Sequence, residues 1–188
     1  YAPGHMRNLK SDGVMLNYSN IYALNKTGEI EDGLSAILGI DYNINEKNGD
    51  SEIEKLSLSL GQVFSNKENL GMPSQSSLDQ KSSDVVGMIN YNFSEIGKIN
   101  YQFALDHNLN DFNYNDISTI LNFGKVEFNL DYLEQQKHIG EEHYASAGLS
   151  LNFNENNKLS FKTKKNFKTD STELYDLSYQ YGIDCLTA

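Results

Sequence analysis

The residues that could carry chemistry in this chain are few and far apart. The 188-residue sequence contains one cysteine and four histidines. His138 and His143 lie five residues apart on either side of two adjacent glutamates, and both residue types can bind metal ions. This spacing matches no established metal-binding motif, and His5 and His107 lie elsewhere in the chain. We therefore expect solvated histidines in loops or at strand ends, with no metal site.

The sequence also gives no sign of an active site. The serine-rich segment 65–83 contains no histidine, so its hydroxyl groups lack a general base and we expect a flexible loop. Five acidic residues on one face of the predicted strands show no pairing that would shift a pKa. They are Asp41, Asp106, Glu127, Asp131 and Asp176. We predict no enzyme, no catalytic residue and no cofactor.

The charged residues exclude one class of partner. The chain carries 15 Lys and Arg against 26 Asp and Glu, a formal net charge of −11. Nucleic-acid binding needs clustered basic residues, so we expect no nucleic-acid partner. One basic cluster could contact lipid phosphates, although we expect ordinary solvated charges. It consists of Lys162, Lys164, Lys165 and Lys168.

Cys185 is the single cysteine and cannot form a disulfide within this chain. In a reducing compartment, a lone cysteine behaves as a small buried hydrophobic residue. Outside the cytoplasm, it instead suggests a bonding partner in another part of the protein. The composition leaves both interpretations open.

An alternation of apolar and polar side chains predicts the elements that position these residues. Within residues 144–153, for example, Leu149, Leu151 and Phe153 alternate with polar residues. A period of two is typical of β-strands with two unlike faces. Nine segments show it: 36–44, 56–60, 85–93, 99–105, 117–123, 126–132, 144–153, 158–167 and 175–181. Asn17–Lys26 is a weaker candidate for a tenth strand.

The predicted strands are long enough to cross a membrane. Counted out to the connections that bound them, they run for about 9–13 residues, whereas strands of globular proteins cluster near 5–6 and a tilted membrane strand needs about 9–11. A soluble sheet with one face on a core also explains the alternation, but it needs a second layer that is not evident here. We predict an all-β, antiparallel, up-and-down transmembrane β-barrel, present as an incomplete open curved sheet of about nine to ten long strands.

The connections between the predicted strands alternate in length. One set is short and lies near 46–51, 94–97, 124, 155–158 and 182–184. The other set is longer, at 65–83, 107–115 and 135–143, with 168–172 as an exception of hairpin length. Outer-membrane barrels have short periplasmic turns and longer outer loops. We therefore assign the first set, with Cys185 beside it, to the periplasm and the second set to the cell exterior.

Several short stretches of the sequence are informative through their order and spacing. They are Pro3–Leu9, Asn17–Lys26, Asn25–Gly28, Glu31–Gly33, Leu38–Tyr42, Leu58–Phe64, Ser82–Gly87 and Tyr175–Tyr181, with Cys185 just past the last, tyrosine-rich strand. Together these stretches resemble the C-terminal barrel domain of the LptD family of lipopolysaccharide-assembly proteins. Asn25–Gly28 and Glu31–Gly33 are similar to an Asn-Arg-x-x-Gly element and an acidic-Gly element of that family, with Lys26 in place of the usual arginine. The most distinctive likeness is Cys185.

The resemblance implies a translocon that inserts lipopolysaccharide into the outer leaflet of a Gram-negative outer membrane. Its partners would be lipopolysaccharide, outer-membrane lipid, an LptE-type plug lipoprotein and periplasmic lipopolysaccharide-bridge proteins. In the family, cysteines at this place pair with cysteines of the N-terminal periplasmic domain. The resemblance therefore implies a disulfide from Cys185 to a residue outside this chain, with a free thiol as the alternative.

Two other functions remain open, a passive porin or specific channel and a soluble β-rich binding module. On the translocon interpretation, residues 1–188 are a part of the barrel domain. The N-terminal periplasmic domain, the first strands and the last strands would then be absent. The lateral seam of the barrel would lie outside the chain, and the sheet should stay open.

Overall fold

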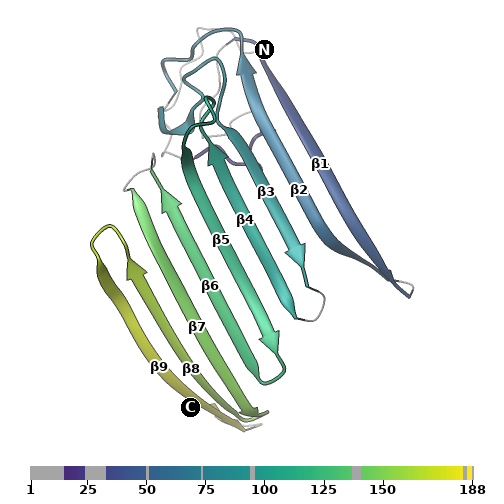
Figure 1. Cartoon of the computed structure of the whole chain (residues 1–188), viewed down its shortest axis with the longest axis vertical. Coiled ribbons are helices and arrows are strands. Elements are labelled where there is room, and N and C mark those ends of the chain that lie inside the picture. Colours follow the sequence, from purple (N-terminus) through teal and green to yellow (C-terminus); the bar gives the residue numbers. More distant parts are fainter. Residues whose placement is uncertain are drawn as a thin grey trace.

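Figure 1 shows the computed structural model of the chain, which describes residues 15–23, 33–49, 51–72, 74–93, 96–136, 141–183 and 186–187. Within these residues, the strands form one sheet, accompanied by a short 3₁₀ turn, η1, at Ser74–Ser76. The strands are β1 Ser35–Asn48, β2 Ser51–Ser65, β3 Val85–Asn92, β4 Gly97–Leu105, β5 Phe112–Phe123, β6 Val126–Gln135, β7 Glu142–Asn154, β8 Asn157–Asn166, β9 Ser171–Ile183 and β10 Leu186–Thr187. No helix in the described part of the chain is long and apolar enough to cross a membrane.

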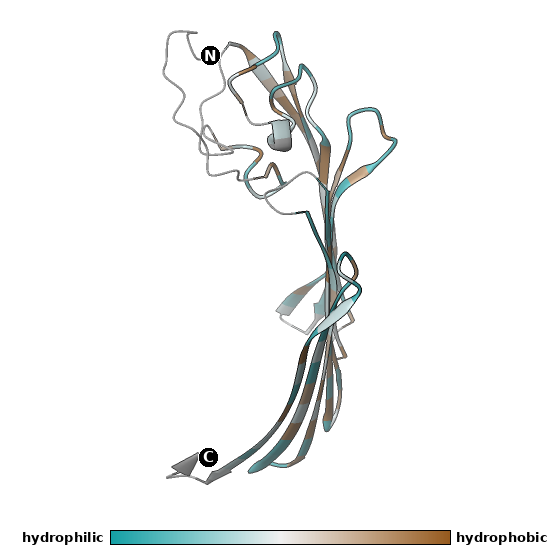
Figure 2. Cartoon of the chain, turned by 90° about the vertical axis from the view of Figure 1, so that its left-hand side faces the viewer, coloured by the Kyte–Doolittle hydropathy of each residue, from teal (hydrophilic) through white to brown (hydrophobic). Residues whose placement is uncertain are grey.

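Each strand pairs in antiparallel fashion with the next one along the chain. The sheet is therefore an up-and-down meander, and β1 and β10 lie at its two opposite edges instead of meeting. Figure 2 shows the sheet edge-on as a curved layer with a concave and a convex face. The predicted open, curved, antiparallel sheet is confirmed, and all nine predicted strands are present.

The short turns and the longer loops lie at opposite ends of the sheet (Figure 1). Gly49 and Gly124 occur in two of the short turns with φ angles of +64° and +65°, a conformation that glycine adopts without steric cost. The longer connections, including the β2–β3 loop at residues 66–84, gather at the other end. The alternation of connection lengths in the sequence thus separates the two ends of the sheet correctly.

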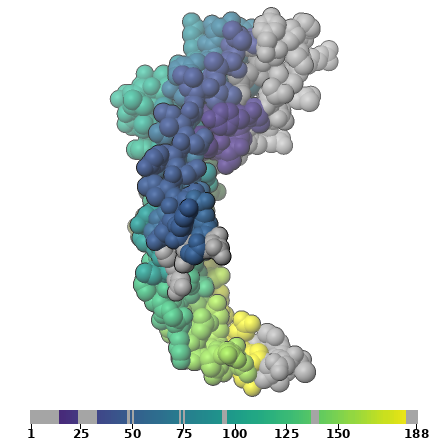
Figure 3. Space-filling view, turned by 90° about the vertical axis from the view of Figure 1, so that its right-hand side faces the viewer, coloured from purple at the N-terminus to yellow at the C-terminus, as the bar shows by residue number. Residues whose placement is uncertain are grey.

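A small hydrophobic core lies on the concave face at the long-loop end. It consists of Leu16, Ile21, Val63, Met72, Leu78, Val86 and Ala104. These residues come from segment 15–23, the β2–β3 loop and strands β2–β4, so two irregular segments cover part of the inner face. Figure 3 shows the atoms of segment 15–23, in purple, within the hollow of the concave side.

Two glycines make room for segment 15–23. Gly39 and Gly61 lie opposite each other on β1 and β2. A Cβ atom at Gly61 would lie 2.8 Å from Ile21 Cδ1, and one at Gly39 would lie 2.0 Å from the hydroxyl of Tyr22. Ile21 is fully buried in this position. The paired glycines therefore form a shallow seat for the segment, which we call the glycine seat.

The residues that face the other way along the same strands are apolar. Ile40 lies opposite Leu60 on the convex face, whereas the neighbouring pair Asp41 and Ser59 faces the concave side. Ile40 and Leu177 are 70% and 71% exposed, although both are aliphatic. An apolar surface that continues over nine strands requires an apolar environment, as the outer surface of a membrane barrel has.

Segment 15–23 is a turn, so the expectation of a strand at Asn17–Lys26 is wrong for the residues that the structure describes. The side chain of Asn17 accepts a hydrogen bond from the Asn20 N–H at 3.1 Å, and the side chain of Asn20 accepts one from the Asn17 N–H at 2.9 Å. These reciprocal bonds satisfy the backbone locally and compete with strand pairing. Residues 24–26 lie outside the described residues.

Substitution at the glycine seat should release segment 15–23. Gly61→Ala places a methyl group against the buried Ile21, and we expect a cost of about 1–3 kcal/mol, or roughly 5- to 150-fold faster proteolytic cleavage within 15–23. Limited proteolysis of the full-length protein in its membrane measures this rate. Gly148→Ala is the matched control, because a Cβ there meets its neighbours at an ordinary 3.7 Å. Equal cleavage rates in both variants would contradict the seat.

Candidate functional site

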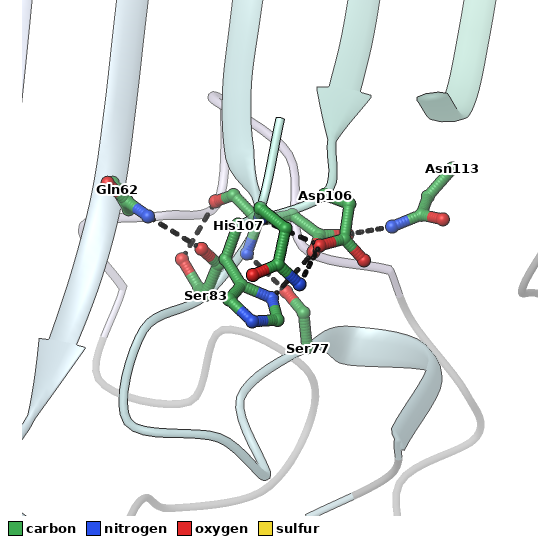
Figure 4. Close-up of polar contacts among 8 residues, drawn as sticks. Gln62, Ser77, Ser83, Asp106, His107 and Asn113 are labelled. Carbon is green, nitrogen blue, oxygen red and sulfur yellow. Dashed lines mark hydrogen bonds and ion pairs between the residues drawn. The ribbon is translucent and has the colours of Figure 1, made fainter. Parts of the chain in front are cut away.

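Ser83 fixes the end of the β2–β3 loop to the sheet. Its Oγ accepts a hydrogen bond from the Val63 N–H at 2.9 Å and donates one to the Asp84 carbonyl at 2.8 Å. Gln62 Nε2 donates to the Ser83 carbonyl at 2.9 Å. Figure 4 shows the Gln62 side chain pointing toward Ser83. Because Ser83 is buried, these bonds are shielded from water and hold the loop against β2.

Asp84 is the centre of this polar network. It is buried, its backbone N–H donates to Ser77 Oγ at 2.8 Å, and its Oδ2 accepts from Asn113 Nδ2 at 2.7 Å. Asn113 belongs to β5, so one carboxylate ties the β2–β3 loop to a strand further along the chain (Figure 4). A buried charge is costly unless it is hydrogen-bonded, and the Asn113 amide offsets part of that cost.

The serine-rich segment 65–83 is packed over much of its length. Six of its described residues are buried, namely Asn69, Met72, Ser76, Ser77, Leu78 and Ser83. The Asn69 N–H also donates to the Asp79 carbonyl at 3.0 Å, which closes the loop on itself. The expectation of a flexible loop is therefore wrong for this part. The polar composition of the segment did not indicate that it is buried. Its serine hydroxyl groups form local hydrogen bonds instead of hydrogen bonds to water.

Three possible metal-binding side chains converge beside this network. Ligand atoms of Asp84, Asp106 and His107 all lie within 4.8 Å of one another. His107 Nδ1 lies 3.1 Å from Asp106 Oδ1, and the same oxygen accepts hydrogen bonds from the backbone and side-chain N–H groups of Asn108 at 2.9 and 3.2 Å. The two Asn108 donors already engage that oxygen. We therefore interpret the group as ordering the β4–β5 loop and assign no metal to it.

A second polar contact holds segment 15–23 on the concave face. Tyr18 Oη donates to Asp41 Oδ1 at 2.6 Å, and Ser59 Oγ donates to the same oxygen at 2.7 Å. Burial and the adjacent Asp41 carboxylate raise the pKa of Tyr18, so its hydroxyl remains a hydrogen-bond donor at neutral pH. The sequence placed Asp41 on the polar face correctly. It did not identify Tyr18 as the partner, because the contact joins a turn to a strand.

The basic cluster divides into two pairs of lysines. Lys165 forms an ion pair with Asp170 at 2.8 Å, and Lys168 forms one with Glu141, both at the long-loop end of the sheet. The hydrogen bonds from these lysines hold the pKa of the Asp170 and Glu141 carboxyl groups below the usual range. Lys165 and Lys168 are thus neutralised at the rim, in agreement with the expectation of ordinary exposed charges.

The other two lysines, Lys162 and Lys164, line a groove on the concave face. The groove has a volume of about 560 Å³ and is lined by residues of β5 to β9. Lys164 Nζ lies 3.3 Å from Glu173 Oε2 and 3.9 Å from the centre of the Tyr144 ring. The alternation of the strand separates Lys165 from Lys162 and Lys164, because residues of opposite parity face opposite sides of the sheet. Lys168 lies beyond the end of β8.

His143 occupies the rim of the sheet between aromatic rings. Its Nε2 lies 3.2 Å from the hydroxyl of Tyr132, and its ring centre lies 4.8 Å from that of Phe167. Tyr132 also donates to Glu134 at 3.1 Å. The predicted position at a strand end is confirmed for His143. His5, His138 and Cys185 lie outside the described residues, so their predicted surroundings stay predictions.

The arrangement as a whole defines a class of protein. A long-stranded antiparallel meander is apolar on its convex face and polar on its concave face, as the wall of a membrane β-barrel is. The sequence model of one family, described as LptD, LPS transport system D, matches residues 8–159. The chain therefore belongs to the LptD family, and its role lies in lipopolysaccharide transport. A comparison with curated proteins finds no match.

Asn113 gives a direct test of the buried network. Asn113→Asp would place a second carboxyl group beside Asp84, so we expect loss of protection of the amides at 76–84 at pH 7.5. The loss should decrease near pH 5, because one carboxyl group can take up a proton when two share a site. Hydrogen exchange of the full-length protein measures this effect. Asn156→Asp, in an exposed turn at the opposite end, is the control, and unchanged protection in Asn113→Asp would contradict the assignment.

Proposed function

We propose that this chain forms part of the wall of an outer-membrane translocon that delivers lipopolysaccharide to the outer leaflet. The observation that carries the proposal is the family match over residues 8–159, together with a sheet whose convex face is suited to lipid. Strands β1–β9 have 8 to 15 residues, which brackets the length that a tilted transmembrane strand needs, about 9–11 residues. A passive porin fits the same sheet, but the family match favours the translocon.

The orientation of the sheet follows from its connections. We place the short turns in the periplasm and the longer loops at the cell exterior, as in other outer-membrane barrels. The hydrophobic core of segment 15–23 and the β2–β3 loop would then cover the outer end of the inner face near β1–β5. Such a cover narrows the aqueous path along this part of the wall. Because a porin needs an open aqueous path, the cover further disfavours the porin function.

The proposed partners divide between the two faces. The convex face would contact outer-membrane lipid, and the concave face would contact lipopolysaccharide and an LptE-type plug lipoprotein. Periplasmic lipopolysaccharide-bridge proteins would bind a periplasmic domain outside this chain. The polar residues and charges of the concave face support a wet interior, because such groups are costly to expose to hydrocarbon.

Depletion of the full-length protein tests the transport role. We expect newly made lipopolysaccharide to remain on the inner side of the outer membrane, because its polar headgroup does not cross hydrocarbon unaided. Surface labelling of intact cells, compared with total lipopolysaccharide after lysis, measures the surface fraction. Depletion of a porin of the same membrane is the control, and an unchanged surface fraction would refute the proposal.

Cys185 is proposed to form a disulfide with a cysteine of the periplasmic domain. The support is that Cys185 follows β9 in the sequence, that β9 ends at the short-turn end of the sheet at Ile183, and that the periplasm is oxidising. In the full-length protein, Cys185→Ser should abolish the change in mobility that reduction causes on a non-reducing gel. Ser178→Cys is a useful control for the effect of cysteine content on mobility. If reduction leaves the wild-type mobility unchanged, the proposed disulfide does not form.

A further inference from the structure

The groove on the concave face has small side chains at its floor and charged side chains along its two sides. Ser146 and Gly148 of β7 form its floor, Asp131 of β6 lies on one side and Lys162 of β8 lies on the other. The strand register places Gly148 between Asn129 and Lys162 in one row across the sheet. The groove is therefore formed by neighbouring strands of one rigid sheet, without any contribution from the loops.

Gly148 is not required by packing. A Cβ atom at this position would lie 3.7 Å from Asn129 and Lys162, an ordinary van der Waals distance. This differs from Gly61, where a Cβ would press on Ile21 at 2.8 Å. The missing side chain at Gly148 thus leaves open space over the middle of the groove, and no part of the described chain fills it.

Most charges around the groove already have partners within the wall. Asp131 Oδ2 accepts a hydrogen bond from Ser146 Oγ at 3.2 Å, and Glu127 Oε1 accepts one from Asn129 Nδ2 at 3.3 Å. Lys164 forms its ion pair with Glu173. These contacts reduce the net attraction of the acidic wall for a cation.

Lys162 differs from its neighbours because it is exposed and makes no ion pair or hydrogen bond within the described residues. Asp176 lies opposite it in the β8–β9 register, yet the two side chains form no ion pair. The small β7 residues beside it contribute no negative charge. Its ammonium group therefore keeps three donors for a ligand above the groove.

We propose that Lys162 and the Ser146–Gly148 floor form a contact site for a phosphate or carboxylate substituent on the sugar portion of lipopolysaccharide. The ammonium group supplies charge-assisted hydrogen bonds to the anion. Hydroxyl groups of the same sugar can donate to the oxygens of Asp131 and Glu127, which explains why acidic side chains border a site for an anionic ligand. This inference rests on the proposed transport function. It adds the place on the concave face where the wall would contact the transported lipopolysaccharide.

Site-specific photo-crosslinking in the full-length protein, in cells that transport lipopolysaccharide, tests the contact. A photoreactive residue at position 162 should form an adduct with lipopolysaccharide that disappears when the supply of new lipopolysaccharide is stopped. Phe161 is the matched control position, because it lies next to Lys162 on the convex face. An adduct there reports membrane lipid and should persist after the supply stops.

Charge substitution then tests the chemistry. With the photoreactive residue at Asn129, across the groove, Lys162→Glu should lower the adduct yield about tenfold and Lys162→Arg should retain it, because a single charge-assisted bond is being removed or kept. Lys165→Glu is the control, since Lys165 is engaged by Asp170 at the rim. Heat-modifiable gel migration confirms that each variant has a folded barrel. Addition of inorganic phosphate to isolated membranes should leave the yield unchanged if the sugar itself is bound.

The outcomes separate this inference from the transport role. A protein adduct at position 162, or a lipid adduct equally strong in Lys162→Glu, would overturn the site while surface lipopolysaccharide stays normal. Competition by inorganic phosphate would overturn the assignment to the sugar and indicate a simple anion site. Failure of the transport role would instead appear as normal surface lipopolysaccharide after depletion of the whole protein.

Discussion

Continuous backbone pairing between neighbouring strands is the constraint on which the rest of this structure depends. In hydrocarbon, every N–H and C=O group needs a partner within the protein, so a membrane wall must be built from fully paired strands. The register shifts in the described pairing lie near strand ends, such as those after Ile44 and Ala104. A shift in the middle of a strand would exchange its two faces. Because the observed register shifts lie near strand ends, apolar side chains stay on the convex face across the whole sheet.

The same constraint explains how much the sequence alone could predict. Nine strands, their antiparallel order and the two ends of the sheet were predictable, because each depends on a local alternation such as that of β7. Contacts between a turn and a distant strand were not, because no periodic signal connects Ile21 with Gly61 or Asp84 with Asn113. The small residues that permit such contacts look the same in sequence whether they form a seat or an open floor, as Gly61 and Gly148 show.

The candidate sites follow the same division. The alternation predicted that Asp41, Glu127, Asp131 and Asp176 share the polar face, and the register places them there. It also separates Lys162 and Lys164 from Lys165 within one strand, which a count of basic residues treats as one cluster. Which of these charges is neutralised depends on neighbours from other strands and turns, such as Asp170 and Glu173. Those neighbours are set by three-dimensional packing, so the chemistry of each lysine became visible only in the structure.

The uneven distribution of the hydrophobic core has a kinetic consequence. Every member of the core lies between Leu16 and Ala104, whereas the described strands beyond β4 contribute none. Consecutive strands such as β3 and β4 pair across a short connection, so their contacts lose little loop entropy and form early. The segment from residue 16 to β4 can thus collapse around its own interior, while β5–β9 gain stability chiefly from strand pairing and from lipid. The first half of the sheet is therefore suited to act as a template onto which the later hairpins add during insertion.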